Sequence, residues 1–471
     1  MRRLSAAMSA AGAAGVLVLA AAVLAASQAP GAGPAPAPVA QQWAASWAAS
    51  PQGPYPSGNA AAQPVLEFAV ESAESGALDQ SFRLIIRPDL WGAQFRIRFT
   101  NAFGTKPVTF DDIYVGLQAS GANVVPGTSH RVTFNRGRAS VALPPGQALF
   151  SDPIRLGFVT AGGTPLLAGR KLALSFHVVG SSGPMTWHAK ALTTSYLTAP
   201  HSGSHSADED DDAFASSTTS WYFVDMLDVL VPAGTAVIAA FGDSITDGTA
   251  STLNGDDRWP DVLSRRLHAT YGSRVSVVNA GIGGNQVLGP SRYSPEEPFS
   301  GGPAARDRLD RDVLALSGLS AVVWLEGIND LSTGATAEAV IAGMQDVVRR
   351  VRARGVRIVG ATITSSLGSS GGSGTAEADE RRRAVNAFIR GAGNFDAVAD
   401  FDAATLDPKT GALRPAFQPN STTGGAGDRL HPNRAGYLAM GNAINLSLIA
   451  QPGLVRRQAH QGDRPRGRLA P

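Results

Sequence analysis

Hydrophobic and polar residues alternate through the first half of the chain, from about residue 43 to residue 230. In QFRIRF, Phe95, Ile97 and Phe99 alternate with arginines, and KLALSFHV at 171–178 repeats the pattern. Such alternation places one face of a strand in a core and the other in water. Pro-Gly, Asn-Arg-Gly and Pro-Pro-Gly turns separate the strands. We therefore expect residues 43–230 to form an antiparallel β-sandwich, jelly-roll-like in architecture.

From residue 235 onward, short apolar strands alternate with helices whose apolar residues recur at helical spacing. Strands that alternate with helices predict a parallel sheet covered on both faces. Ligands of such sheets bind at the carboxyl ends of the strands. The expected strands are TAVIAAF, VSVVNA, AVVWLEG, VRIVGATI and AVADF. The expected helices carry Trp259, Leu263, Leu267 and Tyr271; Val340, Met344, Val347, Val348 and Val351; Val385, Phe388 and Ile389; and Tyr437, Met440, Ile444 and Leu448.

The N-terminus has the layout of a secretory signal peptide, expected over residues 1–29. Arg2 and Arg3 precede a run of Ala, Gly, Val and Leu that is shorter and richer in small residues than the ~20 residues of a spanning helix. We therefore expect cleavage, no stable membrane span and a secreted protein, extracellular or periplasmic. The remaining expected segments are a Pro/Ala linker at 30–42, an α/β domain at 235–450 and a disordered basic tail at 451–471.

The composition of the chain excludes several classes of catalytic and binding site. The 471 residues suffice for two domains, and the absence of cysteine excludes a disulfide framework, a thiol nucleophile and a thiolate metal site. The formal net charge is +2, but arginines gather in the last sixteen residues, so the body is slightly acidic. This balance argues against nucleic acid as a partner. The oligomeric state stays open.

One serine lies just past the carboxyl end of the first strand of the α/β region, in FGDSITDG at 241–248. Ser244 is either a turn residue or a nucleophile, and a hydroxyl needs a base to become nucleophilic. His431 offers that base in GDRLHPNRAG, where Asp428 lies three residues away, at most about 10 Å. Pro432 biases His431 away from helical geometry and suits the first position of the closing helix.

These residues define a set of predicted roles. His431 would take the proton of Ser244 and return it to the leaving alcohol, while Asp428 would fix the imidazole tautomer. The N–H groups of Ser244 and Gly284 and the amide of Asn329 would bind the oxyanion. Each motif has a simpler interpretation: a Gly-Asp-Ser turn, a surface Asp-His pair, and an asparagine that caps the segment after its strand.

The four motifs together, FGDSITDG, the glycine of GIGGN, GIND and DRLHP, resemble the four blocks of the SGNH hydrolases, also called GDSL esterases and lipases. The resemblance covers roughly residues 235–450 and implies a flavodoxin-like three-layer α/β/α fold. It also implies Ser244 as nucleophile, Gly284 and Asn329 in the oxyanion hole, and Asp428 and His431 completing the triad. Upstream, WAASWAAS and TWHAKALTTSY are similar to a secreted bacterial and fungal branch related to acylhydrolases found with xylan-degrading enzymes.

Other motifs carry weaker signals. GSSGG at 368–372 fits the nucleophile elbow of another esterase fold, but it lies in a Ser/Gly run and not in a strand-to-helix turn. Asp243, Asp247 and Asp330 are expected to order turns. The two histidines of HSGSH at 201–205 have a spacing that metals use, but the acidic run after them indicates a solvated loop. We expect neither a metal nor a cofactor.

The sequence thus predicts a secreted serine esterase that hydrolyses carboxylic esters through an acyl-enzyme. The resemblance favours short acyl groups, including acetyl groups on polysaccharides or sugars. One alternative is a lipase or arylesterase with the same triad. Another is a carbohydrate-binding protein that acts through the β-sandwich.

Overall fold

The computed structural model describes residues 40–59, 64, 66–160, 164–419 and 427–449. The expected signal peptide, most of the expected linker and the expected basic tail lie outside the described residues. The first strand, β1, begins at Gln41, which we had placed in the linker. Across the described ranges, no helix combines the length and apolarity that a membrane crossing requires.

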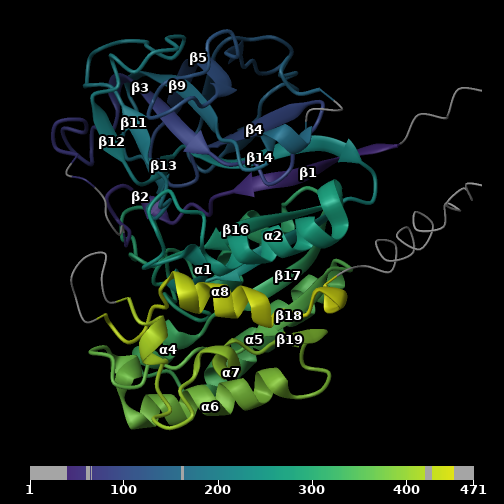
Figure 1. The fold of residues 1–471 in the computed structure, drawn as a ribbon. Coiled ribbons are helices and arrows are strands. Elements are labelled where there is room, and N and C mark those ends of the chain that lie inside the picture. The colour runs from purple at the N-terminus through teal and green to yellow at the C-terminus, as the bar shows by residue number, and fades with distance from the viewer. Residues whose placement is uncertain (1–39, 60–63, 65, 161–163, 420–426, 450–471) are drawn as a thin grey trace, which may run out of the picture. The chain divides into compact units, whose positions relative to one another are not determined.

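Antiparallel sheets form the first half of the described chain, as predicted (Figure 1). One sheet has the order β1 (Gln41–Ala48), β14 (Val224–Pro232), β4 (Phe95–Thr100) and β8 (Ala148–Phe150). The second has the order β12 (Ser216–Thr218), β11 (Ser195–Leu197), β3 (Leu78–Ile86), β9 (Leu172–Ser181), β5 (Val108–Leu117) and β6 (His130–Arg131), with β7 (Val141–Leu143) paired to β5. A small third sheet contains β13 (Trp221–Tyr222), β10 (Thr186–His188) and β2 (Gly53–Pro54).

An aromatic core holds the two large sheets together. Phe99 of β4 lies 5.1 Å from Phe110 of β5 and 5.3 Å from Phe176 of β9, centroid to centroid, and all three rings are buried. Tilted and edge-to-face pairs of this kind stabilise a core beyond the area that they bury. The apolar positions of QFRIRF and KLALSFHV therefore face inward, as their alternation predicts.

The polar face of β4 is not in water, contrary to the simple two-face expectation. Arg98 forms a two-point ion pair with the buried Asp225, and Arg96 pairs with the buried Asp228 of β14. Arg96 also donates to Ser317 Oγ, which lies just before the third strand of the α/β half. The arginine face is thus covered by that half, and ion pairing compensates the charges of the two buried carboxylates.

Both faces of β9 are buried as well, because a loop covers the outer side of its sheet. The guanidinium of the buried Arg83, on the neighbouring β3, donates to Ser175 Oγ and to the backbone carbonyls of Asp208 and Asp210. The sequence predicts a solvated loop for this acidic run, but its backbone carbonyls bind Arg83 and hold the run against the sheet. Most of its carboxylates remain exposed.

The second half contains the predicted parallel sheet, with the flavodoxin-like order β16, β15, β17, β18, β19 (Figure 1). Its strands are β15 (Ala236–Gly242), β16 (Val275–Gly281), β17 (Leu319–Leu325), β18 (Arg357–Ala361) and β19 (Ala397–Ala399). The helices are α1 (Ser244–Asp247), α2 (Trp259–Tyr271), α3 (Ala305–Leu309), α4 (Ile328–Ser332), α5 (Ala337–Ala353), α6 (Ala376–Arg390), α7 (Phe401–Thr405) and α8 (Arg434–Ala443).

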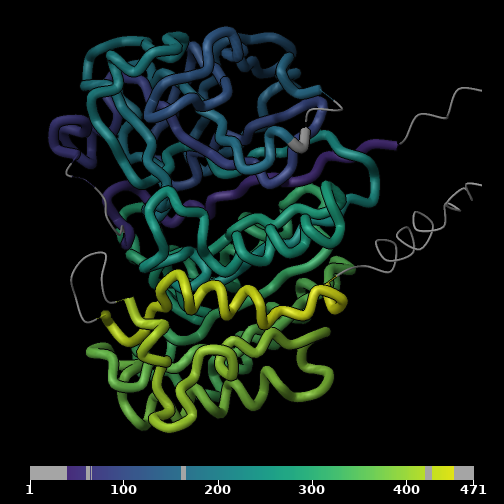
Figure 2. The backbone as a smooth tube through the Cα atoms, in the orientation of Figure 1, coloured from purple at the N-terminus to yellow at the C-terminus, as the bar shows by residue number. Residues whose placement is uncertain are grey.

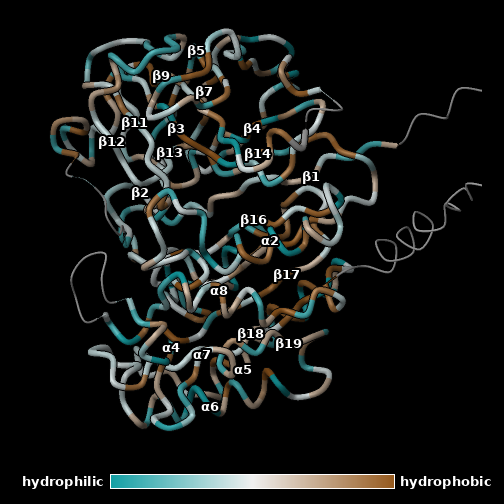
Figure 3. Tube along the Cα trace, in the orientation of Figure 1, coloured by the Kyte–Doolittle hydropathy of each residue, from teal (hydrophilic) through white to brown (hydrophobic). Residues whose placement is uncertain are grey.

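Successive residues of β15 enter two different apolar layers. Val237, Ala239 and Phe241 belong to the same buried cluster as residues of α5 and α6, whereas Ile238 and Ala240 belong to the cluster that contains residues of α2 and α8. Helices therefore cover both faces of the sheet, and Figure 3 shows apolar residues along β17 but many hydrophilic ones on α6. The last helix is shorter than predicted: α8 ends at Ala443, and Leu448 lies in a separate 3₁₀ turn.

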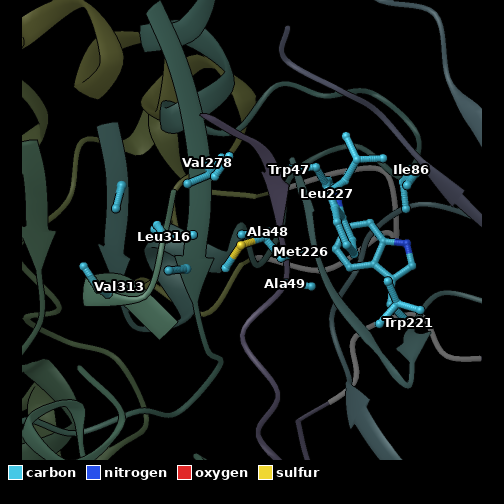
Figure 4. Packing of buried hydrophobic residues seen from close by; sticks show 14 of the residues in the cluster. Trp47, Ala48, Ala49, Ile86, Trp221, Met226, Leu227, Val278, Val313 and Leu316 are labelled. Atoms are coloured by element: carbon cyan, nitrogen blue, oxygen red, sulfur yellow. The ribbon is translucent and has the colours of Figure 1, made fainter. Parts of the chain in front are cut away.

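The sandwich and the parallel sheet share one continuous apolar core. β1 runs along the boundary between them (Figure 2), and its Ala45 N–H donates to Ser317 O at 2.9 Å. Figure 4 shows Met226 and Ala48 of the sandwich close to Leu316 of the α/β half. The two halves therefore bury part of each other's apolar surface, and the sandwich packs directly beside the parallel sheet.

Candidate active site

Ser244 lies just past the carboxyl end of β15, the strand between β16 and β17 in the parallel sheet. β15 ends at Gly242, and Asp243 caps α1 because its Oδ1 accepts the N–H of Ile245 at 2.9 Å. Gly242 has no room for a side chain, since a Cβ there would lie 2.1 Å from Leu325 O. The tight turn presents a hydroxyl on a residue that is only 4% exposed.

The structure brings Ser244, His431 and Asp428 into one hydrogen-bonded chain. Ser244 Oγ lies 2.8 Å from His431 Nε2, and His431 Nδ1 lies 2.5 Å from Asp428 Oδ2. Asp428 Oδ1 also accepts the backbone N–H groups of Leu430 and His431, which folds the segment into a tight turn with Arg429 at φ +60°. The carboxylate is thereby fixed against the ring.

The sequence predicts Pro432 at the first position of the closing helix, but the structure places it before the helix. Asn433 is the N-cap of α8, and its side chain accepts the N–H groups of Ala435 and Gly436. The helix begins at Arg434, so Pro432 precedes the cap. An asparagine cap satisfies two of the free donors at the start of the helix.

Gly284 and Asn329 follow β16 and β17, the two strands that flank β15. Asn329 Nδ2 donates to Asn285 O at 2.8 Å, which joins the two segments, and among the described residues its second hydrogen has no acceptor. Within the described part of the chain, the backbone N–H groups of Ser244 and Gly284 donate to no other residue. Gly284 has φ +82°, a left-handed conformation that favours glycine. Three donors are thus available at this edge of the sheet.

Two buried side chains support the segment that carries Gly284. Asn285 is fully buried, and its amide donates to Gly301 O and Pro303 O at 2.7 Å. Arg308 donates to Asn285 Oδ1, to Ala280 O of β16 and to Gly242 O of β15. One buried guanidinium therefore ties the ends of both strands to this segment. The sequence gives no local signal for Arg308.

Buried carboxyl groups lie under the same edge. Burial raises the pKa of Asp243 to about 7, that of Glu326 to about 8 and that of Asp330 to about 6. Asp330 accepts the N–H groups of Val287 and Leu288 and so orders the loop, as the sequence predicts. These carboxyl groups accept hydrogen bonds from neighbouring N–H groups, and the low polarity around them disfavours their charged forms.

The sandwich supplies two groups that sequence reasoning missed. His188 Nε2 lies 3.2 Å from Asp247 Oδ1, and Lys190 Nζ lies 2.5 Å from Thr249 Oγ1. Both side chains are buried and both partners belong to the segment that begins at Ser244. They come from TWHAKALTTSY, whose spacing gives no hint of a contact with the sheet.

Two other motifs stay apart from this site. GSSGG at 368–372 forms a turn in which Gly368 N–H donates to Gly374 O, between β18 and α6, so it is no strand-to-helix elbow. The two histidines of HSGSH face different carboxylates, His201 facing Glu71 and His205 facing Asp208. In the described ranges, no group of three or more His, Asp or Glu side chains is arranged to hold a metal ion.

A small polar cavity of about 40 Å³ lies between the sandwich and α2. Asp247 and His188 line it together with Arg87, Arg258 and Asp261, but Ser244 and His431 do not. Arg87 and Arg258 both pair with Asp261 there. The cavity is part of the boundary between the halves and not the entrance to the Ser244 hydroxyl.

Gly281, at the end of β16, allows the segment after Ser244 to approach the sheet. A Cβ at this position would lie 2.3 Å from Asp247 N and 2.9 Å from the Thr246 carbonyl carbon. We expect Gly281→Ala to displace α1, to lower the free energy of unfolding by about 1–3 kcal/mol and to reduce kcat. Urea unfolding and steady-state ester hydrolysis measure both effects. Gly157→Ala is the control, because only His130 Nε2, at 3.7 Å, lies near its Cβ; equal behaviour of the two variants would contradict this prediction.

Comparisons with known proteins agree on one part of the chain. Residues 240–439 match the model of the GDSL-like lipase/acylhydrolase family. No curated protein matches the chain. Similar solved structures include a carbohydrate acetylesterase family member from Sinorhizobium meliloti (18% identity, 45% of this chain and 97% of that chain, TM-score 0.35). Also similar is a lipase/acylhydrolase from Enterococcus faecalis (21% identity, 50% of this chain and 100% of that chain, TM-score 0.32). A third is a member of the lipolytic protein G-D-S-L family from Veillonella parvula (18% identity, 44% of this chain and 95% of that chain, TM-score 0.33).

Proposed function

Because residues 240–439 belong to the GDSL-like lipase/acylhydrolase family and the chain is a carboxylic ester hydrolase, we propose that it cleaves esters through an acyl-enzyme on Ser244. The observation that carries this proposal is the hydrogen-bonded chain from Ser244 Oγ through His431 to Asp428. A serine, an imidazole and a carboxylate in this order form the nucleophile, base and orienting group of acyl transfer.

In the proposed reaction, Ser244 Oγ attacks the ester carbonyl while its proton passes to His431 Nε2. The carbonyl oxygen gains negative charge, and the N–H groups of Ser244 and Gly284 and the amide of Asn329 donate to it. Collapse of this intermediate breaks the bond to the alcohol, which takes the proton from His431. Water then repeats the sequence on the acyl-enzyme and releases the acid.

We propose short acyl groups, with acetyl groups on polysaccharides or sugars as candidate substrates, for a protein secreted after cleavage of the segment 1–29. Docking on a lipid aggregate would favour a contiguous apolar surface. Among the described residues, the large exposed hydrophobic side chains instead come from separate segments: Phe68, Leu166, Val179, Leu253, Leu438 and Leu448. This distribution favours a small ester over a long-chain lipid.

Two measurements test the proposal. A fluorophosphonate, which modifies activated serines, should label the peptide that contains Ser244, and the exposed Ser370 of the GSSGG turn should stay unlabelled. Release of p-nitrophenol should be faster from the acetate ester than from the palmitate ester. Faster turnover of the palmitate would favour the lipase alternative. Inertness on every ester, together with binding to insoluble xylan, would favour a carbohydrate-binding protein.

A further inference from the structure

We propose that His188 and Lys190 of the sandwich are positioning residues of the active site, acting through Asp247 and its surroundings on the segment that carries Gly284. The inference rests on the proposed function, since it assigns Gly284 to the oxyanion site. It gives the sandwich an indirect part in turnover, through the position of the oxyanion donor. The two cationic side chains would make the first half of the chain a component of the catalytic apparatus.

Asp247 connects the Ser244 turn to the segment after β16. It ends α1, three residues after Ser244, and is 1% exposed. Its Oδ2 accepts the N–H of Gly283 at 2.8 Å, and its Oδ1 faces His188. A movement of this carboxylate would therefore shift Gly283 and, one residue further, the free N–H of Gly284.

The surroundings of His188 favour its cationic form as the partner of Asp247. Its Nδ1 lies 2.9 Å from Ser50 O and its Nε2 lies 3.2 Å from Asp247 Oδ1, so both ring nitrogens face acceptors. Two acceptors require two N–H donors, which only the imidazolium form has. Trp221 stacks on the ring at 5.5 Å. Burial alone would lower the pKa of His188, but the charge and hydrogen bond of Asp247 raise it overall.

Lys190 approaches the same segment from the sandwich. Its Nζ donates to Thr249 Oγ1, and Thr249 O accepts the hydroxyl of Tyr437 on α8. The ideal position of a Cβ on Gly283 would lie 3.0 Å from Lys190 Nζ and 3.5 Å from Asp247 Oδ2. The ammonium group and the carboxylate thus face the same glycine. A side chain at this position would press against the Lys190 ammonium group.

Lys190 lies among carboxylates, whose negative charge its ammonium group can offset beside the oxyanion site. Burial lowers the pKa of Lys190, while Asp247, Asp243 and Asp428 act in the opposite direction. An uncompensated carboxylate near the developing oxyanion would oppose its negative charge. Arg258 and His188 also interact electrostatically with the Asp247 carboxylate. Lys190 is the member of this set that lies beside the backbone of Gly283.

The decisive variant is Lys190→Met, which nearly keeps the length of the side chain and removes its charge. We expect kcat to fall at least about tenfold, because a complete oxyanion donor is worth about 10²–10³. KM should change less than about threefold, because uniform substrate binding is retained. Rates are divided by the concentration of sites that a fluorophosphonate titrates, so that unfolded protein does not enter kcat.

A double-mutant cycle separates charge compensation from packing. If Lys190 acts by offsetting Asp247, the variant Lys190→Met/Asp247→Asn should be less impaired than the product of the two single effects predicts. His188→Gln, which retains one donor without the charge, should lower kcat in the same direction as Lys190→Met. Ser317→Ala is the control, because it removes a hydrogen bond with Asp228 at the other end of β17.

The outcomes are distinct. Unchanged kcat in both Lys190→Met and His188→Gln, or additive effects in the cycle, would overturn the inference while labelling of Ser244 still supported the esterase. Loss of the folded circular dichroism spectrum in both variants would overturn it as well, because the residues would then serve folding. Failure of the wild-type protein to react with the fluorophosphonate would instead overturn the proposed function.

Discussion

Ser244→Ala is expected to hydrolyse p-nitrophenyl acetate about 10⁴-fold or more slowly than the wild type. The change removes the only atom of residue 244 that can form the acyl-enzyme. The backbone N–H of residue 244 and the imidazole of His431 remain. Residual hydrolysis would therefore come from oxyanion stabilisation and from water activated by the base.

Stability should separate this effect from misfolding. Ser244 Oγ contributes one hydrogen bond, to His431 Nε2, so the free energy of unfolding should change by about 1 kcal/mol or less. Ser370→Ala is the matched control, because Ser370 is exposed in a turn far from β15 in the sequence. Wild-type turnover in Ser244→Ala, with the same circular dichroism spectrum, would exclude Ser244 as the nucleophile.

The convergence of the candidate residues at the strand ends was predictable from sequence. Strands of a parallel sheet present their carboxyl ends at one edge, so apolar runs that stop at Ser244, Gly284 and Asn329 point to a common place. His431 and Asp428 were predictable because they lie three residues apart on one loop. Periodicity and chain geometry carry this information locally, without knowledge of tertiary contacts.

The contribution of the sandwich was not predictable in this way. His188 and Lys190 lie more than fifty residues before Ser244, and nothing in the sequence around them distinguishes them from ordinary polar residues. The same limit applies to Arg96 and Arg98: alternation identifies two faces of β4 but not the layer that covers the second face. Contacts between layers depend on how the halves pack, which a local pattern does not encode.

Asp428→Asn is expected to lower kcat by about 10³- to 10⁴-fold with little change in KM. Asp428 Oδ1 accepts the N–H groups of Leu430 and His431, so the amide oxygen of the introduced side chain should occupy that position and its NH₂ group should face His431 Nδ1. The ring must then carry its proton on Nε2. An imidazole in that tautomer donates to Ser244 and accepts no proton from it.

The pH dependence of this defect follows from the carboxylate. Partial burial alone would raise the pKa of Asp428, but the hydrogen bond and charge of His431 and two backbone N–H groups bring it well below its usual value. The carboxylate therefore persists above about pH 4, so protonation of Asp428 should not contribute to the pH dependence of the wild-type kcat between about pH 6 and pH 9. Asp407→Asn is the matched control, since Asp407 Oδ1 accepts the N–H of Lys409 in a similar turn away from the site. A ratio of wild-type to variant kcat near one for Asp428→Asn would mean that another group orients the imidazole of His431.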